Sequence, residues 1–175
     1  MYSNHELAFR VIEKEDLDIL KEIHNDQSVW ENLFNIDFVD DKSQEYWLEG
    51  LHRKRNDLRF VLCLSEDQNV VVGRVRIQNI NLHHNNCEIG LDLHESYRGK
   101  GYGLKCYSLV LKFLFDEYNM NVVYLKVADF NSRAKVLYKK LGFKETGSLP
   151  SFFYRKGKYW DYCIMSLKKD ECRHI

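Results

Sequence analysis

The residues best suited to chemistry form one short run, Tyr97 to Gly103, in which three glycines alternate with basic and aromatic side chains. Glycine lets the backbone approach a ligand closely, and a helix that begins here presents free N–H groups and the positive end of its dipole. A phosphate suits this arrangement, and Arg98 and Lys100 add positive charge. The run fits neither common phosphate loop, since GxGxxG needs a glycine at Leu104 and GxxxxGK[ST] does not occur. A glycine-rich turn without a ligand is the alternative.

The segment before that run reads as a strand with one apolar and one polar face. Apolar residues alternate with polar ones from Cys87 to His94, which places Glu88 and Asp92 on the same face. A carboxylate there can act as a general base, directly or through water. Glu88 is therefore the candidate base and Asp92 the substitute, while an ordinary solvated carboxylate is the alternative for Glu88.

A second candidate lies in a predicted helix from Asn131 to Leu141. Asn131 or Ser132 is suited to cap its N-terminus, and Gly142 follows its end. Tyr138 lies within this helix, at a spacing that also fits packing into the core.

Two motifs resemble those of the GNAT family of N-acetyltransferases. Arg98-x-x-Gly101-x-Gly103 resembles the loop with which this family binds the pyrophosphate of acetyl-CoA. The segment Asn131-Ser132-Arg133-Ala134, continued by Leu137 to Phe143, is similar to the family's Asn-x-x-Ala-x-x-x-Tyr-x-x-x-Gly-Phe. The motifs occur in the family's order, and with their strands and helices they cover about residues 70–167.

The resemblance implies a set of site residues for acetyl-CoA as cosubstrate. Backbone amides of the loop hold the pyrophosphate, and the pantetheine arm pairs like an extra strand with the backbone before it. Asn131 hydrogen-bonds the cofactor, although it could be only a helix cap. Tyr138 is the general acid for the leaving thiolate, although it could be only a core aromatic. The implied cofactor-binding residues are Leu91, Asp92, Leu93, Arg98, Gly99, Lys100, Gly101, Tyr102, Gly103 and Asn131.

The implied reaction is direct attack of a primary amine on the thioester. An alkyl amine with a pKa near ~10.4 is neutral only about once in 2,500 molecules at pH 7, a cost of roughly 4–5 kcal/mol, so a base is needed. A covalent acyl-cysteine route is disfavoured, because neither Cys106 nor Cys163 has a histidine partner in any motif.

The acceptor is open at this point. The segment Phe153 to Met165 resembles the branch with ribosomal-protein N-terminal and spermidine acetyltransferases. We expect a protein N-terminus or a small amine as acceptor, with a polyamine such as spermidine or an amino sugar as the alternative. A CoA-binding regulatory module that has lost catalysis is the alternative from another class.

Charge is unevenly distributed in a chain whose net charge is zero. Residues 1–50 hold 13 acidic and 4 basic residues, whereas residues 98–144 hold 3 acidic and 10 basic ones. The overall balance argues against a nucleic-acid binder. The acidic part, which suits a cationic acceptor, contains an aromatic group whose main role we expect to be core packing: Trp30, Phe34, Phe38, Tyr46 and Trp47.

Other sequence features exclude several classes of protein. The chain has no secretory signal and no apolar stretch long enough for a membrane span, so we expect a cytoplasmic protein. Its five cysteines include no CxxC pair, which indicates reduced, mostly buried thiols. A metal site at His83-His84 is disfavoured, since adjacent histidines on a strand point to opposite faces. A homodimer is possible.

The elements needed to position these residues predict one domain, residues 1–175. At 175 residues and 45% hydrophobic composition, the chain is long enough for one core. The predicted class is α/β, with a GNAT-like mixed, mostly antiparallel central sheet flanked by helices in the order β-α-α-β-β-β-α-β-α-β-β. The expected strands are 7–12, 60–64, 70–80, 87–93, 122–127, 143–148 and 159–167, and the expected helices 15–24, 43–55, 103–118 and 131–141.

Overall fold

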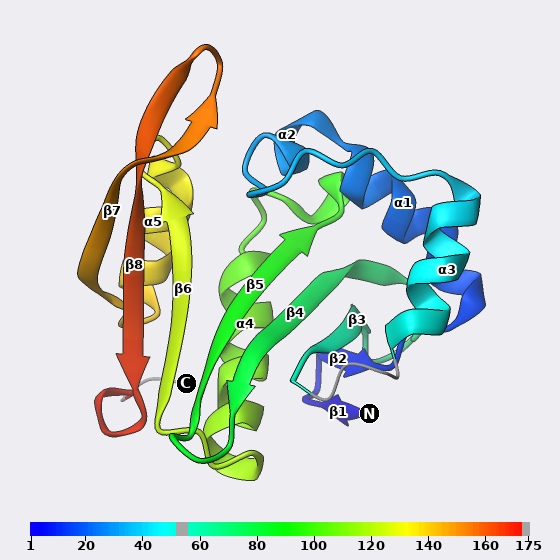
Figure 1. Cartoon of the computed structure of the whole chain (residues 1–175). Helices are drawn as coiled ribbons and strands as arrows, with labels where there is room; N and C mark the ends of the chain where they lie inside the picture. Colours follow the sequence, from blue (N-terminus) through cyan, green and yellow to red (C-terminus); the bar gives the residue numbers. More distant parts are fainter. Residues whose placement is uncertain (52–55, 173–175) are drawn as a thin grey trace.

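The computed structural model describes residues 1–51 and 56–172, and their strands form one eight-stranded sheet in the order β1-β2-β3-β4-β5-β6-β8-β7 (Figure 1). Of its neighbouring pairs only β5 and β6 run parallel, which confirms the predicted mixed, mostly antiparallel α/β fold. The strands are β1 (Tyr2–Ser3), β2 (Leu7–Arg10), β3 (Leu58–Leu64), β4 (Val71–Asn81), β5 (Asn86–Leu93), β6 (Val122–Ala128), β7 (Lys144–Arg155) and β8 (Lys158–Lys168). The α-helices are α1 (Leu17–Asn25), α2 (Gln27–Trp30), α3 (Asp41–Leu51), α4 (Tyr102–Lys112) and α5 (Ser132–Lys140).

Strand alternation divides the core between the two faces of the sheet. In β2, Leu7 and Phe9 belong to the large cluster that contains the buried side of α4. Ala8, between them, packs with Leu20 of α1 in a smaller cluster. Successive side chains of a strand point to opposite faces, so α4 and α1 cover opposite sides of the sheet.

Several boundaries differ from those expected. The helix predicted over 103–118 is α-helical only to Lys112 and continues as a π-helical turn, Phe113–Glu117. The last two strands extend into a long hairpin, because bulges between Glu145 and Gly147 and between Leu149 and Phe153 accommodate Pro150 within β7. The strand β1 and the short helix α2 were not predicted. Part of the helix expected over 43–55, namely 52–55, lies outside the described residues.

The histidine pair lies in the turn between β4 and β5 rather than on a strand. Backbone N–H groups of His83 and His84 donate to the Asn81 side chain. Their rings contact each other, with centroids 4.6 Å apart. The expectation that they point to opposite faces is therefore wrong, because the chain turns here. Residues 1–51 and 56–172 contain no group of three potential metal ligands.

The sheet splits where β5 and β6 diverge. Their parallel pairing covers only Asn86–Glu88 opposite Val122–Tyr124. Beyond it, β5 continues alongside β4 and β6 alongside β8, and Figure 1 shows the two halves spreading apart. Parallel neighbours that separate leave unpaired backbone groups on their facing edges, which is where the site lies.

Among the helices of the described residues, none has the length and apolar character needed to cross a membrane.

Candidate active site

A cavity of about 780 Å³ occupies the split between β5 and β6. Its walls include Ile89–Leu93 of β5, Lys126–Ala128 of β6, the loop before α4 and the inner side of α5. This volume lies in the range of small-molecule and cofactor sites.

The glycine-rich loop forms one end of the cavity and begins α4. Gly99 and Gly101 have φ values of +77° and +86°, a left-handed conformation that side chains other than glycine rarely adopt. Gly101 is the N-cap of α4, so the first N–H groups of that helix lie at the loop. A Cβ atom at Gly103 would lie 3.2 Å from Leu137 of α5. The loop thus has the backbone geometry of an anion site.

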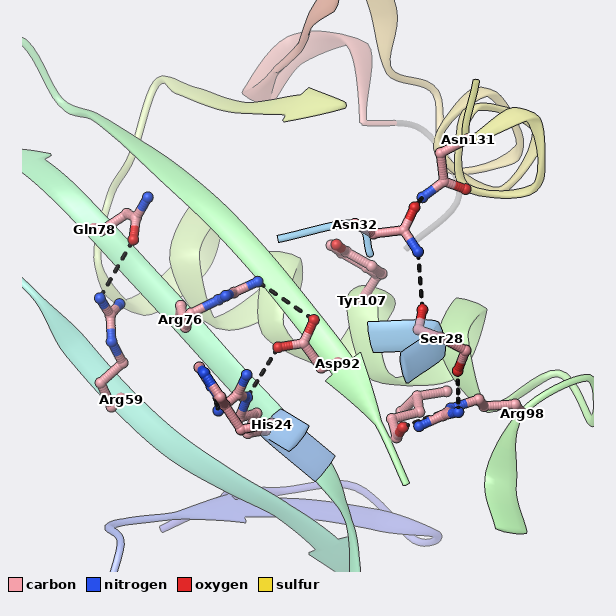
Figure 2. Close-up of polar contacts among 12 residues, drawn as sticks. His24, Ser28, Asn32, Arg59, Arg76, Gln78, Asp92, Arg98, Tyr107 and Asn131 are labelled. Carbon is pink, nitrogen blue, oxygen red and sulfur yellow. Dashed lines mark hydrogen bonds and ion pairs between the residues drawn. The ribbon is translucent and has the colours of Figure 1, made fainter. Parts of the chain in front are cut away.

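Arg98 does more than add charge to this loop. Its Nε donates to the Leu93 carbonyl at 2.8 Å, and its Nη1 contacts Asp26 at 3.1 Å and Ser28 at 2.5 Å (Figure 2). Burial acts to raise the pKa of Asp26, but hydrogen bonds from Ser28 and Arg98 hold it below its usual value. The charge of Arg98 is thus neutralised by α2, while Lys100 is exposed.

The edge of β5 that faces the cavity is open. Leu91, Asp92 and Leu93 pair on one side with β4. On the other side the described chain provides no strand partner beyond Glu88, so an extended ligand has backbone groups to pair with. The Leu93 carbonyl is already occupied by Arg98.

Tyr138 lines the cavity together with Tyr107 of α4. The Tyr107 hydroxyl donates to the Tyr138 hydroxyl across 3.3 Å, and the rings meet edge to face. Burial raises the pKa of Tyr138 above its ordinary value, and the hydrogen bond from Tyr107 only partly offsets this. Tyr138 therefore stays protonated near neutral pH.

Glu88 lies at the point where β5 and β6 separate. The residue is buried, with 7% of its surface exposed, and still lines the cavity. Its Oε2 accepts from Lys126 of β6 and from Asn79, each at 2.9 Å. A second oxygen remains available to a water or an amine.

Asp92, the alternative candidate for the general base, forms ion pairs with two arginines. Its carboxylate contacts Arg74 at 2.9 Å and Arg76 at 3.4 Å. Burial alone would raise the pKa of Asp92, but the two arginines outweigh it and keep the pKa below its ordinary value. The carboxylate of Asp92 has both oxygens engaged by arginines, so it has little capacity left to accept a proton.

Asn131 caps α5 and also links it to α2. Its Oδ1 accepts from the Ala134 N–H at 3.1 Å, as the capping alternative predicts. Its Nδ2 donates to Asn32, and Asn32 in turn donates to the Ser28 carbonyl, as Figure 2 shows. The segment around α2 thus connects the two sides of the split sheet through Asn131 and Arg98.

The comparison with known proteins identifies the family. A family model described as "Acetyltransferase (GNAT) domain" matches residues 6–144. The chain belongs to the GNAT acetyltransferase family. As a member, it is an N-acetyltransferase that uses acetyl-CoA as acetyl donor.

Several individual proteins are similar to this acetyltransferase along most of its length. The spermidine N(1)-acetyltransferase of Vibrio cholerae is 28% identical over 159 residues, which cover 90% of each chain. That of Escherichia coli K12 is 28% identical over 91% of this chain and 84% of its own. An uncharacterised N-acetyltransferase of Bacillus subtilis, YokL, is 26% identical over 97% and 94% of the two chains.

Solved structures show the same fold. The spermidine N-acetyltransferase of Vibrio cholerae in complex with CoA and spermine superposes with a TM-score of 0.90 at 24% identity, covering 98% of this chain and 100% of the other. A dodecameric structure of that enzyme gives a TM-score of 0.80 at 27% identity, covering 95% and 96%.

Arg76, Tyr107 and Arg133 line the cavity but are not among the site residues predicted from the sequence. Tyr107 was placed in the apolar stripe of its helix, where a tyrosine hydroxyl is easily overlooked. Arg76 lies on β4, and its alternation with Val75 and Ile77 is the signal that it belongs to the polar face. Arg133, inside the second motif, lines the cavity beside Gly99.

The N-terminal aromatic group is less buried than expected. Trp47 packs in the α1 cluster, but Phe34, Phe38 and Tyr46 are 51%, 67% and 62% exposed. Phe34 lines the cavity and stacks on Tyr162, with centroids 5.5 Å apart. Core packing is therefore the wrong main role for these three residues, and only Phe34 among them lines the cavity.

The cysteines are free and buried, apart from half-buried Cys172. Burial raises the pKa of both Cys106 and Cys163, the former to about 12. A thiol with a raised pKa is a weak nucleophile, which supports direct transfer over an acyl-cysteine route.

Proposed function

We propose that this acetyltransferase moves the acetyl group of acetyl-CoA directly to the primary amine of a small molecule. The observation that carries the proposal is the Tyr138 hydroxyl, a group with a raised pKa that lines the cavity between β5 and β6. A protonated hydroxyl is what a leaving thiolate needs. The whole chain, residues 1–175, acts as one domain in this proposal.

The loop and the open strand edge would bind the cosubstrate. N–H groups of Arg98 to Gly103 meet the pyrophosphate at the start of α4, and Arg133 adds a cation beside Gly99. The pantetheine arm pairs with Leu91 and Asp92 along the free edge of β5. Asn131 lines the cavity, and the second hydrogen of its Nδ2 can bond the cofactor while the first stays on Asn32.

The reaction needs two proton transfers. The amine nitrogen attacks the thioester carbon, a C–N bond forms, and the C–S bond breaks as the tetrahedral intermediate collapses. Glu88 accepts the amine proton, directly or through a water at its free oxygen. Tyr138 donates its proton to the CoA sulfur.

Among acceptors, the relatives favour a small amine over a protein N-terminus. Two of the most similar curated proteins are named spermidine N(1)-acetyltransferases, so a polyamine is supported better than the ribosomal-protein type of acceptor. The open mouth of the cavity, lined by Phe34 and Tyr162, is accessible to a flexible small amine. Amino sugars remain the other small class to test.

The proposal is tested by CoA thiol release from acetyl-CoA in the presence of polyamines, amino sugars and peptides with free N-termini. We expect release with at least one small amine and none with the peptides. Peptide-dependent release without any release by small amines would restore the N-terminal acceptor. Acetyl-CoA binding without release by any amine would favour the non-catalytic CoA-binding module.

Two further sequence predictions remain predictions. Size-exclusion chromatography with light scattering tests the predicted homodimer. A larger assembly is a second expected result, because a solved structure of the Vibrio cholerae relative is a dodecamer. The cytoplasmic location is checked by cell fractionation.

A further inference from the structure

A row of arginines lines the sheet beside the reaction site. In β4, Arg74 and Arg76 lie opposite Asp92 and Gly90 of β5. Arg59 of β3 pairs in register with Arg76. Figure 2 shows Arg76 reaching Asp92 and Arg59 reaching Gln78. Arg76, Gln78 and Asp92 line the cavity.

Each carboxylate that lines the cavity already has a cationic partner. Glu88 is bonded to Lys126 at 2.9 Å, and Glu31 to Lys156 at 2.8 Å. Asp92 is bonded to Arg74 at 2.9 Å and also contacts Arg76. Within the described residues, every carboxylate that could bind a polycationic acceptor in this cavity is thus already paired with a cation.

Among the cations that line the cavity, Arg76 is one with donors to spare. Its Nη2 reaches Asp92 at 3.4 Å, at the long end of hydrogen-bond distance, and the residue contributes to the cavity wall. A Cβ atom at Gly90 would lie 2.9 Å from that Nη2, so the absence of a side chain makes room for the guanidinium to lie across β5. Gln78, two residues along the same face, lines the cavity as well.

The surroundings of Arg74 show the same excess of donors over acceptors. Its Nη2 is buried without a hydrogen-bond partner. Its Nη1 lies 3.1 Å from Nδ1 of His24, while Nε2 of that ring contacts the Asp37 carbonyl at 2.6 Å. Since a carbonyl only accepts, Nε2 carries the proton and Nδ1 accepts from Arg74, so His24 is neutral. One carboxylate, Asp92, thus serves two guanidiniums, and an additional anion is what this cluster lacks.

We propose that the acceptor is a primary amine that also carries a carboxylate, and that this carboxylate binds Arg76. The inference rests on the proposed function and narrows it, since it favours amino acids and related amines over polyamines. A guanidinium holds a carboxylate in a two-point contact that orients it as well as neutralising it. Binding there would place the carboxylate on the sheet beside Gly90, with Glu88 on the same face of β5.

The test uses amine pairs that differ only by a carboxylate: lysine with cadaverine, ornithine with putrescine, and phenylalanine with phenethylamine, plus spermidine. Rates of CoA release give kcat/KM for each member. In the pair with the most active carboxylate-bearing amine, we expect kcat/KM of that amine to exceed kcat/KM of its partner by about 10- to 100-fold. This is the range expected for a charge-assisted hydrogen bond. In Arg76→Gln this ratio should fall close to one, through KM more than through kcat.

Two variants separate binding from folding. Arg76→Lys keeps the charge but loses the two-point contact, so it should retain part of the preference. Lys168→Gln, at an exposed position of β8, removes the same charge elsewhere and should leave the preference intact. Wild-type preference for cadaverine, putrescine or spermidine, or an unchanged ratio in a folded Arg76→Gln protein, would overturn the inference and leave the proposed function standing.

A binding arm distinguishes failure of the inference from failure of the proposed function. Calorimetry with the CoA-bound protein measures binding of the same amines without turnover. Binding of the carboxylate-bearing members that is lost in Arg76→Gln, without acetylation of any amine, would support the anion site and contradict the transferase proposal. Absence of both binding and acetylation would overturn both.

Discussion

At the residue scale, Tyr107 and Tyr138 lie side by side but differ in burial. Tyr107 is fully buried and its hydroxyl lies 3.3 Å from that of Tyr138, while Tyr138 is half-buried. The motif Asn131 to Phe143 was sufficient to select Tyr138 from the sequence. Nothing in the apolar pattern of α4 distinguished Tyr107, because its partner lies 31 residues away in the chain.

Replacing Tyr138 by phenylalanine tests its role as the general acid. We expect kcat to fall by about 10²- to 10⁴-fold, since a positioned acid contributes that much. The dissociation constant of acetyl-CoA, measured by calorimetry, should change little, because the hydroxyl meets the sulfur only as it leaves. Tyr107→Phe is the matched control, and loss of one hydrogen bond should lower kcat by no more than about tenfold. Unchanged turnover in Tyr138→Phe would retire it as the acid.

His24 makes stability depend on pH. Burial, and then the nearby charge of Arg74, lower the pKa of His24 below its ordinary value of 6.5. The folded state therefore favours the neutral ring, and its contribution is complete above pH 6.5 and decreases as the pH falls toward the lowered pKa. Urea unfolding across this range should show the stability advantage of wild type over His24→Gln shrinking with acidity. The exposed His5→Gln controls for removing a histidine, and an advantage that grows with acidity would contradict the account.

At the scale of elements, strands and helices with a regular sequence pattern were predicted more accurately than bulged or very short elements. The period of two in residues 87–93 and the helical caps near Asn131 and Gly142 predicted β5 and α5 closely. The bulged hairpin of β7 and β8 was underestimated, because Pro150 and Gly147 read as a strand end in isolation. The short α2 has a local N-cap in Asp26, but its links to Arg98 and Asn131 are tertiary contacts that no local pattern contains.

The glycine loop gives an element-scale prediction through Gly101→Ala. A left-handed residue with a side chain costs about 1–2 kcal/mol, so the free energy of unfolding should fall by that amount. The acetyl-CoA dissociation constant should rise as the start of α4 shifts. Gly50→Ala is the control, because Gly50 lies in α3 with no atom within 4 Å of an added Cβ. The free energy of unfolding of Gly50→Ala should rise by up to about 1 kcal/mol, and this variant should bind acetyl-CoA normally. If both variants bound acetyl-CoA equally well, the role of the glycine loop in cofactor binding would be contradicted.

At the scale of the whole molecule, folding pairs much of the charge that the sequence keeps apart. Acidic residues of the N-terminal third contact basic residues far along the chain: Glu6 with Lys105, Asp26 with Arg98, and Glu31 with Lys156. These are three of the thirteen acidic residues in residues 1–50, so the suitability of this part for a cationic acceptor stays a prediction. The positive third does coincide with the loop and α5, as the CoA motifs required. The proposed carboxylate site draws on Arg76, which comes from residues 51–97, a stretch whose acids and bases balance.

The central claim is acetyl transfer to an amine in the cavity between β5 and β6. Its most direct test is incubation with acetyl-CoA carrying a ¹³C-labelled acetyl group and the amine panel, followed by mass spectrometry of the amines and of the intact protein. The account predicts one labelled acetyl amide for each CoA thiol released, no labelled acetyl on the protein, and loss of the product in Tyr138→Phe. Labelled protein, or bound CoA with no labelled amide from any amine, would contradict it.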